Sequence, residues 1–198
     1  VFSGSAGTTH KLNNKDSDTQ NRVNNLTIAP NNYLDVWTSN AYNGLYIEGT
    51  FTMGSGSTIQ RDSDTSSTKL YFSGNSWDID PNVSGGAGAG ILDISSFNDG
   101  SYFYGSTPSG APLNGGLVFA TADTVQGNDM TLSSYIQADG KTWDTNGYDT
   151  TCPRFRSEAS DTTFLFGAGS TINVTSAADN YGFGDNVADT SITASGVA

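Results

Sequence analysis

The chain has 198 residues and carries 8 Lys and Arg against 20 Asp and Glu, which gives a formal net charge of −12 at pH 7. Eight scattered bases cannot form the basic surface that binds nucleic acid, nor the polybasic segment that holds a protein on a membrane. One cysteine allows no intrachain disulfide, and the longest apolar runs, such as 164–166, are far shorter than the ~20 residues that cross a bilayer.

Short aromatic and β-branched segments, separated by Gly, Asn, Asp, Ser and Pro, predict β-strands. Ten Phe, nine Tyr and three Trp argue for a folded chain, because disordered segments are poor in aromatic residues. The acids are almost all Asp, which favours turns over helix interiors, so no stable helix is expected and the fold class is all-β. In chain order the expected strands cover 26–28, 33–37, 45–53, 69–72, 77–80, 91–94, 101–104, 117–120, 130–137, 163–166 and 171–174.

Recurring phrases favour a parallel β-solenoid, similar to a β-helix. Residues 51–59 and 164–172 each read as a strand, a Gly-x-Gly corner and a second short strand, 113 positions apart. Asp-Thr pairs at 18–19, 64–65 and 161–162 precede apolar runs, at offsets of 46 and then 97. Because these offsets share no period, the sequence predicts an irregular solenoid, with a β-sandwich or jelly roll as the alternative. A single domain is expected over the whole chain, with an internal boundary at the Gly-rich stretch near positions 85 to 90.

The segments 1–10, 25–30 and 45–59 resemble β-solenoid segments of large secreted adhesins and of phage tail or virion appendage proteins. The resemblance covers about residues 1–80 and returns at 163–175. It implies a structural role outside the cell or on a virion, often with carbohydrate as the target. It carries over no catalytic residues.

Carboxylates near an aromatic residue give the one candidate for catalysis. Asp78 and Asp80 lie two positions apart on an expected strand, so their side chains share a face beside Trp77. With Glu48, they are the carboxylates from which a glycoside hydrolase could take its pair, about 5–9.5 Å apart. The same alternation is typical of a solvated outer face, and that interpretation is favoured. The chain is therefore expected to have no catalytic residue, and Asp78, Asp80 and Glu48 are the candidates if it is an enzyme.

Exposed aromatic residues are the candidates for glycan contact. Tyr102 and Tyr104 lie between glycines, and Trp143 lies in a polar loop; with Trp77 they could offer flat apolar surface beside hydrogen-bonding side chains. A strand with three consecutive aromatic residues is also typical of a core or of a contact between subunits.

Nucleophile and metal chemistry have little support. His10 is the one histidine and Cys152 the one cysteine, so a triad or a standard zinc site lacks its parts. The loop at 144–149 is rich in oxygen ligands, and Asp144, Asn146 and Asp149 are the residues that would hold calcium. No cofactor is otherwise expected, and a hydrated turn is the favoured interpretation of this loop.

These observations lead to one expected function and one alternative. We expect a non-enzymatic structural or adhesive protein, located outside the cell, on the cell surface or on a virion. Its expected partners are copies of itself, other surface subunits and carbohydrate, with no nucleic acid and no membrane insertion. The alternative is a β domain that binds or cleaves carbohydrate, of the lectin or tailspike kind.

Overall fold

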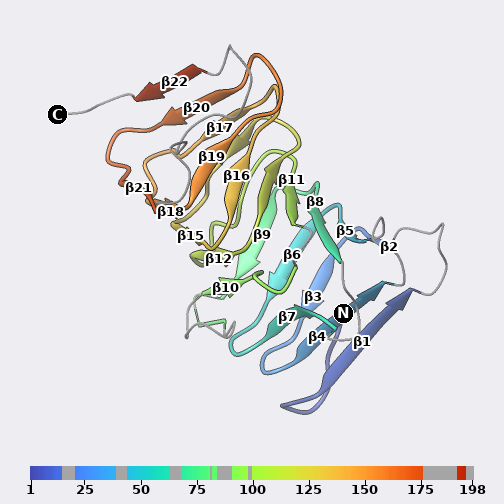
Figure 1. Cartoon of the computed structure of the whole chain (residues 1–198). Coiled ribbons are helices and arrows are strands. Elements are labelled where there is room, and N and C mark those ends of the chain that lie inside the picture. The colour runs from blue at the N-terminus through green and yellow to red at the C-terminus, as the bar shows by residue number, and fades with distance from the viewer. Residues whose placement is uncertain are drawn as a thin grey trace.

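The computed structural model describes residues 1–14, 21–38, 44–62, 68–80, 82–83, 91–97, 100–175 and 191–194. Within these ranges all regular structure is β-strand, and the paired strands run parallel. The chain winds into a parallel β-solenoid, whose turns stack from the N-terminal end to the C-terminal end (Figure 1). This confirms the predicted solenoid and excludes the sandwich alternative for the described part of the chain.

Most turns of the solenoid, here called rungs, contribute one strand to each of three columns. The first column contains β1 (Thr9–Asn14), β4 (Tyr33–Thr38) and β7 (Thr58–Arg61), followed by β10 (Leu92–Asp93), β12 (Leu113–Gly115), β15 (Met130–Leu132), β18 (Thr150–Cys152) and β21 (Ile172–Val174). The second is one seven-stranded sheet of β2 (Asn21–Val23), β5 (Gly44–Ile47), β8 (Lys69–Phe72), β11 (Ser101–Phe103), β13 (Val118–Ala120), β16 (Tyr135–Gln137) and β19 (Arg154–Arg156). The third contains β3 (Leu26–Ile28), β6 (Thr50–Met53) and β9 (Ser76–Ile79), then β14 (Thr124–Val125), β17 (Thr142–Asp144), β20 (Thr163–Phe166) and β22 (Ser191–Ala194).

The rungs differ in length, which explains why the sequence shows no single period. Thr9 pairs with Tyr33, 24 positions later, and Tyr33 pairs with Thr58, 25 positions later. Further along, Ser101 pairs with Val118, only 17 positions later. The phrases at 51–59 and 164–172 nevertheless occupy the same corner, from β6 to β7 and from β20 to β21. Of the Asp-Thr pairs, only 161–162 lies in the described residues.

Alternation along each strand separates the core from the surface. In β5, β6 and β8 the buried residues alternate with half-buried ones, as a strand with one inward face requires. The inward rows are aliphatic and aromatic: Phe72 lies 5.1 Å from Phe103, and Phe155 lies 5.2 Å from Phe164, between ring centroids. The core is therefore a continuous column inside the solenoid.

A tight turn recurs at the corner between the third and first columns. The backbone N–H of one residue donates to the carbonyl three positions earlier, in the pairs Thr8 to Ser5, Asn32 to Ala29, Ser57 to Gly54, Val83 to Asp80, Tyr148 to Thr145 and Ser170 to Gly167. The third residue of the turn has a positive φ at Gly7, Asn31, Gly56, Gly147 and Gly169. Glycine and asparagine tolerate this conformation best, so this corner explains why four glycines and Asn31 occupy these positions.

The structure divides or adds to several expected strands. The segment 45–53 is two strands, β5 and β6, separated at Glu48 and Gly49, and 130–137 is likewise divided into β15 and β16. The strands that were not predicted are short or polar and carry weak alternation: β1, β2, β12, β14, β17, β18, β19 and β22. The proposed boundary near positions 85 to 90 falls outside the described residues.

Candidate functional site

One outward row runs across the whole seven-stranded sheet. Its members are in register from strand to strand: Arg22, Tyr46, Tyr71, Tyr102, Phe119, Gln137 and Arg156. Arg22 is exposed, Gln137 is buried, and the other members are half-buried. We call this row the outer ladder. It exists because each strand places the same alternate position outward, one strand spacing of about 4.8 Å from the next.

Four aromatic rings stack in the middle of the outer ladder. The ring centroids of Tyr46 and Tyr71 are 4.0 Å apart with planes at 2°, those of Tyr71 and Tyr102 are 4.6 Å apart at 20°, and those of Tyr102 and Phe119 are 4.5 Å apart at 8°. Burial, the hydrogen bond to the Tyr46 hydroxyl and the neighbouring phenols together raise the pKa of Tyr71 well above its ordinary value. The Tyr71 hydroxyl therefore stays protonated at physiological pH.

Glycines at the start of two strands, Gly44 in β5 and Gly100 directly before β11, make room for these rings. Gly100 has φ +104°, and a Cβ there would lie 2.7 Å from Cε2 of Phe119. A Cβ on Gly44 would lie 2.7 Å from Cε2 of Tyr71. The stack therefore depends on residues with no side chain beneath the rings.

Cations lie at both ends of the ladder. The Arg22 guanidinium carbon is 4.5 Å from the Tyr46 ring centroid, and Nη1 of Arg22 is 2.5 Å from Oε1 of Glu48. At the other end, Arg156 and Arg154 lie 5.1 and 5.0 Å from the Tyr135 ring centroid. Such contacts stabilise the cation by about 0.5–1 kcal/mol at exposed sites.

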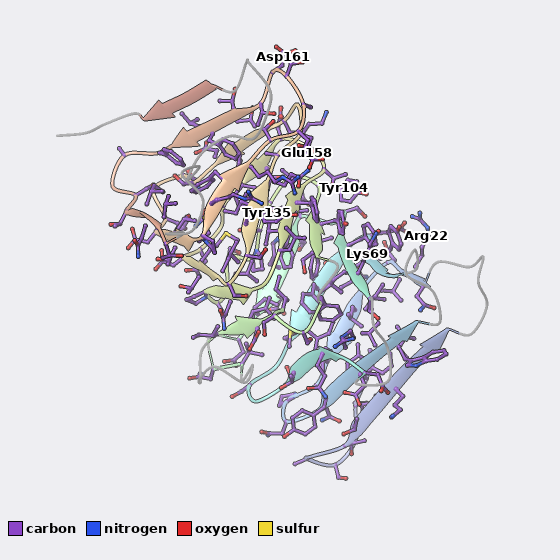
Figure 2. The ribbon with its side chains drawn as sticks, viewed as in Figure 1. Arg22, Lys69, Tyr104, Tyr135, Glu158 and Asp161 are labelled. Carbon is purple, nitrogen blue, oxygen red and sulfur yellow. The ribbon has the colours of Figure 1, made fainter. Side chains whose placement is uncertain are left out.

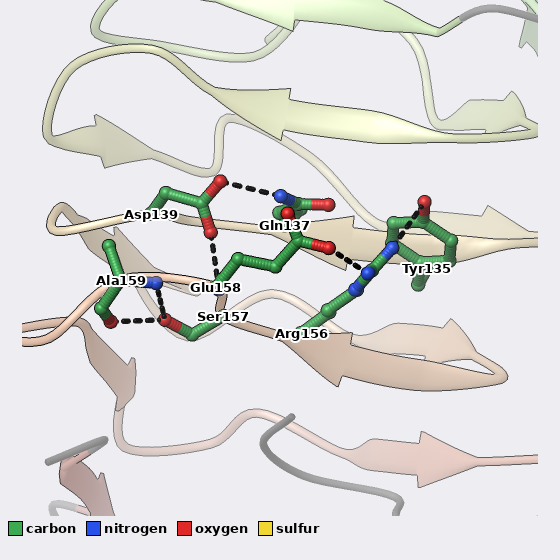
Figure 3. A network of polar contacts seen from close by, with 7 residues as sticks. All are labelled: Tyr135, Gln137, Asp139, Arg156, Ser157, Glu158 and Ala159. Carbon is green, nitrogen blue, oxygen red and sulfur yellow. Dashed lines mark hydrogen bonds and ion pairs between the residues drawn. The ribbon is translucent and has the colours of Figure 1, made fainter. Parts of the chain in front are cut away.

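The C-terminal end of the ladder is a polar network (Figure 3). Arg156 donates from Nη1 to the Tyr135 hydroxyl at 2.9 Å and pairs through Nη2 with Glu158. Gln137 donates to Asp139 Oδ2 at 2.5 Å, and the other oxygen of Asp139 accepts the backbone N–H of Glu158 at 2.7 Å. The network links β16 to β19 and fixes the direction of the Arg156 side chain.

Two flanking rows give this face its two edges. Residues two positions before the ladder include Lys69, Tyr135 and Arg154, and residues two positions after it include Tyr104 and a series of polar or acidic side chains. The labelled side chains Arg22, Lys69, Tyr104, Tyr135 and Glu158 lie along this face of the solenoid (Figure 2). Tyr104 is 38% exposed, which makes it one of the few large apolar side chains open to solvent in the described residues.

The stacking of the four aromatic rings determines which contacts the outer ladder can make with a ligand or partner. The inner ring faces cover one another, so a sugar ring cannot stack on them as it would on an isolated aromatic residue. What remains open is ring edges, tyrosine hydroxyls, the flanking cations and Tyr104. This face therefore suits a long, linear contact made from the side rather than a single closed pocket.

The candidate carboxylates lie on two different sheets. Asp78 is exposed on β9, and Asp80 follows it, with Oδ1 accepting the N–H of Asn82 at 2.8 Å in a local turn. Glu48 lies beyond β5 and pairs with Arg22. Asp78 and Asp80 therefore lie close together at the end of β9, while Glu48 lies beyond another strand, β5. Asp80 and Glu48 each make a structural contact.

The candidate tryptophans are less open than expected. Trp143 is fully buried in β17, so its placement in an exposed polar loop is wrong: Trp143 pairs in register with Thr124 and Phe164, on the inward row. Trp77 is half-buried against Phe72, with ring centroids 4.9 Å apart, and its Nε1 donates to Ser106 Oγ at 3.0 Å. Tyr102 and Tyr104 do lie on the outer face.

The carboxylates of the oxygen-rich loop accept hydrogen bonds from backbone N–H groups. Asp144 Oδ1 accepts the N–H of Asn146 at 2.7 Å, and Asn146 has φ 51°. Asp149 Oδ1 accepts the N–H of Thr171 at 2.7 Å. Among the residues that the structure describes, no group of three His, Cys, Asp or Glu is placed to hold a metal ion. Calcium at Asp144, Asn146 and Asp149 stays an untested prediction.

The two potential nucleophile residues lie far from each other in the stack. His10 lies in β1 with Nε2 3.1 Å from Asn32 Oδ1, while Cys152 is fully buried in β18. Desolvation by burial raises the pKa of the Cys152 thiol to about 12, although a hydrogen bond with the backbone of Arg154 acts in the opposite direction. The thiol is therefore protonated and shielded from solvent.

The ladder was missed in the sequence, although a signal for it exists. Each of its aromatic residues is the middle letter of a short strand, as in Leu-Tyr-Ile at 45–47, Leu-Tyr-Phe at 70–72 and Ser-Tyr-Phe at 101–103. Aligning the chain on these triplets would have predicted the register. Unequal rung lengths concealed the alignment.

No protein-family model matches the chain, and no curated protein or solved structure matches it either. In the described part of the chain, no helix is long and apolar enough to cross a membrane. We therefore infer the function from the geometry of the described residues.

Proposed function

We propose that this chain is a non-enzymatic structural or adhesive protein of an extracellular, cell or virion surface, and that the outer face of the seven-stranded sheet is its contact surface. The observation that carries the proposal is the outer ladder: seven side chains in register over seven strands, of which all but Gln137 are aromatic or cationic. Interface cores are enriched in Tyr, Trp, Phe and Arg, which bury large area at low entropic cost.

The rigidity of the ladder supports a contact role. Its rings are held by stacking and its arginines by ion pairs and cation–π contacts, so little side-chain freedom is lost when a partner binds. Other subunits of the proposed surface, including copies of this chain with the same seven-stranded sheet, are the partners that such a face would meet. Assembly with such subunits is the first interpretation of this face.

Glycan contact is the second interpretation, and Tyr104 favours it. Its side chain is 38% exposed beside the row of tyrosine hydroxyls, where a saccharide can find both apolar surface and hydrogen-bond partners. The regular spacing of the strands suits a linear, repetitive glycan better than a small free sugar.

The test combines sedimentation velocity with a glycan array on the wild type and two variants. Tyr104→Ala removes exposed aromatic surface from the contact face, and Val125→Ala removes a similarly exposed side chain, 42% open, from β14 in another column. We expect association or glycan binding to weaken about tenfold in Tyr104→Ala, a loss of about 1.4 kcal/mol that is typical of an interface aromatic residue. Binding should stay unchanged in Val125→Ala.

Two results would overturn the proposal. A wild-type chain that stays monomeric at high concentration and binds no glycan has no contact function of this kind. Release of reducing ends from a bound glycan, abolished by Asp78→Asn, would instead establish the carbohydrate-cleaving alternative.

A further inference from the structure

Tyr46 and Tyr71 are arranged unlike any other pair in the described structure. They occupy paired positions on β5 and β8, their ring centroids are 4.0 Å apart, and their planes differ by only 2°. Their hydroxyls are joined by a hydrogen bond, so the two rings point the same way. The near-parallel stacking therefore brings the ortho carbons of one ring, Cε1 and Cε2, close to the other ring.

We propose that Tyr46 and Tyr71 form a site of oxidative cross-linking, at which peroxide activated by a haem peroxidase joins the two rings as dityrosine. Each phenol gives up one electron and its hydroxyl proton, and the two phenoxyl radicals couple through a new carbon–carbon bond between ortho carbons. The hydrogen on each coupled carbon then moves to the phenolic oxygen. One peroxide takes up the two electrons and two protons and becomes two waters, so the protein loses two hydrogen atoms.

Geometry selects this pair over its neighbours. Tyr102 covers the other face of Tyr71, but its ring is 4.6 Å away and tilted by 20°. The next ring along the ladder is Phe119, which has no phenol to oxidise. Both Tyr46 and Tyr71 are half-buried on the outward face, so their edges remain open to an oxidant in solution.

The product would link two rungs of a chain that cannot form an intrachain disulfide, since Cys152 is its one cysteine. The new bond spans 25 positions and constrains the unfolded chain as a disulfide of that loop size does. We expect the melting temperature to rise by about 5–10 °C. This inference does not depend on which partner the contact face binds.

The experiment treats the full chain, at high dilution, with hydrogen peroxide and horseradish peroxidase. The expected result is dityrosine fluorescence in monomeric protein, an intact mass lower by two hydrogen atoms, and a cross-linked peptide that contains Tyr46 and Tyr71. Monomeric protein that forms no dityrosine, or that links Tyr71 to Tyr102 instead, overturns the proposal, as does dityrosine found only between chains.

Matched variants separate the site from general tyrosine oxidation. Tyr46→Phe and Tyr71→Phe keep the stacked ring and should each lower the monomeric dityrosine yield at least tenfold. Tyr102→Phe and Tyr148→Phe, the latter in the turn before β18, should leave it unchanged. Circular dichroism confirms that each variant is folded, and equal yields in all four variants would contradict the assignment.

Discussion

Short acidic side chains at the corners of the C-terminal rungs, Asp123, Asp129, Asp139 and Asp149, link one rung to the next. Asp129 Oδ1 accepts the N–H of Asp149 at 3.0 Å, and Asp149 Oδ1 in turn accepts the N–H of Thr171. Asp123 and Asp139 make the same kind of bond to Thr142 and Glu158. At a corner the backbone ladder is interrupted, so a side-chain oxygen supplies the acceptor that the neighbouring rung no longer offers.

Removing one of these acceptors should destabilise the fold without affecting the core. Asp149→Ala leaves the N–H of Thr171 without its carboxylate partner and should lower the free energy of unfolding by about 1 kcal/mol. Asp149→Asn keeps an oxygen in the same place and should cost less than about 0.5 kcal/mol. Urea denaturation of both variants measures this difference, and equal losses would contradict the role of the acceptor.

The buried thiol predicts a loss of stability in alkali. The pKa of Cys152 is about 12 in the folded chain, against about 8.5 for an unfolded cysteine. Between these values the unfolded chain loses the proton while the folded chain keeps it, so stability falls as pH rises. From pH 8 to pH 10 the wild type should lose about 1–2 kcal/mol more than Cys152→Ser, in which the other titrating groups are unchanged. Equal losses in urea titrations at the two pH values would refute this prediction.

Gly100 is the residue on which the outer ladder depends most directly. Gly100→Ala combines a positive φ with a Cβ 2.7 Å from the Phe119 ring, and should destabilise the chain by about 2–4 kcal/mol. Gly169→Ala is the matched control, because Gly169 has φ +88° but no atom within 4 Å of its added Cβ. That variant should lose only about 1–2 kcal/mol. Thermal denaturation of the two variants separates backbone strain from the steric conflict.

At the scale of the element, inward alternation made the aromatic strands predictable. Strands such as β8 and β20 carry alternating apolar residues and lie close to the expected 69–72 and 163–166. The short polar strands, such as β18 with the sequence Thr-Thr-Cys, form because the rungs on either side pair with them. Their strand conformation comes from neighbours far apart in sequence, which local patterns do not encode.

The residues of the candidate site were likewise predictable where the signal is local and not where it depends on distant strands. Tyr102 and Tyr104 were found because an aromatic run is visible locally. The alignment of Tyr46, Tyr71 and Tyr102 was not predicted, because it depends on the register between strands. Trp143 was misplaced because Asp and Thr flank it, while its burial depends on Phe164 in the next rung.

The stack in the outer ladder should contribute to stability as a unit. Tyr71→Ala removes two ring contacts and should cost about 1–3 kcal/mol, while Tyr71→Phe keeps both rings in contact and should cost less than about 0.5 kcal/mol. Guanidinium titrations compare the two variants. A loss in Tyr71→Phe as large as that in Tyr71→Ala would assign the stabilisation to the hydroxyl instead.

At the scale of the whole molecule, each rung contacts the rungs directly before and after it, so stability should vary along the stack. Strands β2 and β19 each pair on one side of the seven-stranded sheet, whereas β11 and β13 pair on both sides. We expect hydrogen exchange to be slowest in β11 and β13 and faster in β2 and β19. Peptide-resolved exchange measures this gradient, and uniform protection would indicate a single cooperative unit.

The recurring corner turn has a consequence for how this chain tolerates change. A residue gained or lost in the middle of a strand would exchange its inward and outward side chains from that point on. Here the turn ends at Thr8, Asn32 and Ser57, the residues directly before β1, β4 and β7, so rungs of 24 and of 25 residues enter the first column in the same phase. An error in length therefore stays within the rung where it arises, and the molecule can lengthen or shorten its other corners one rung at a time.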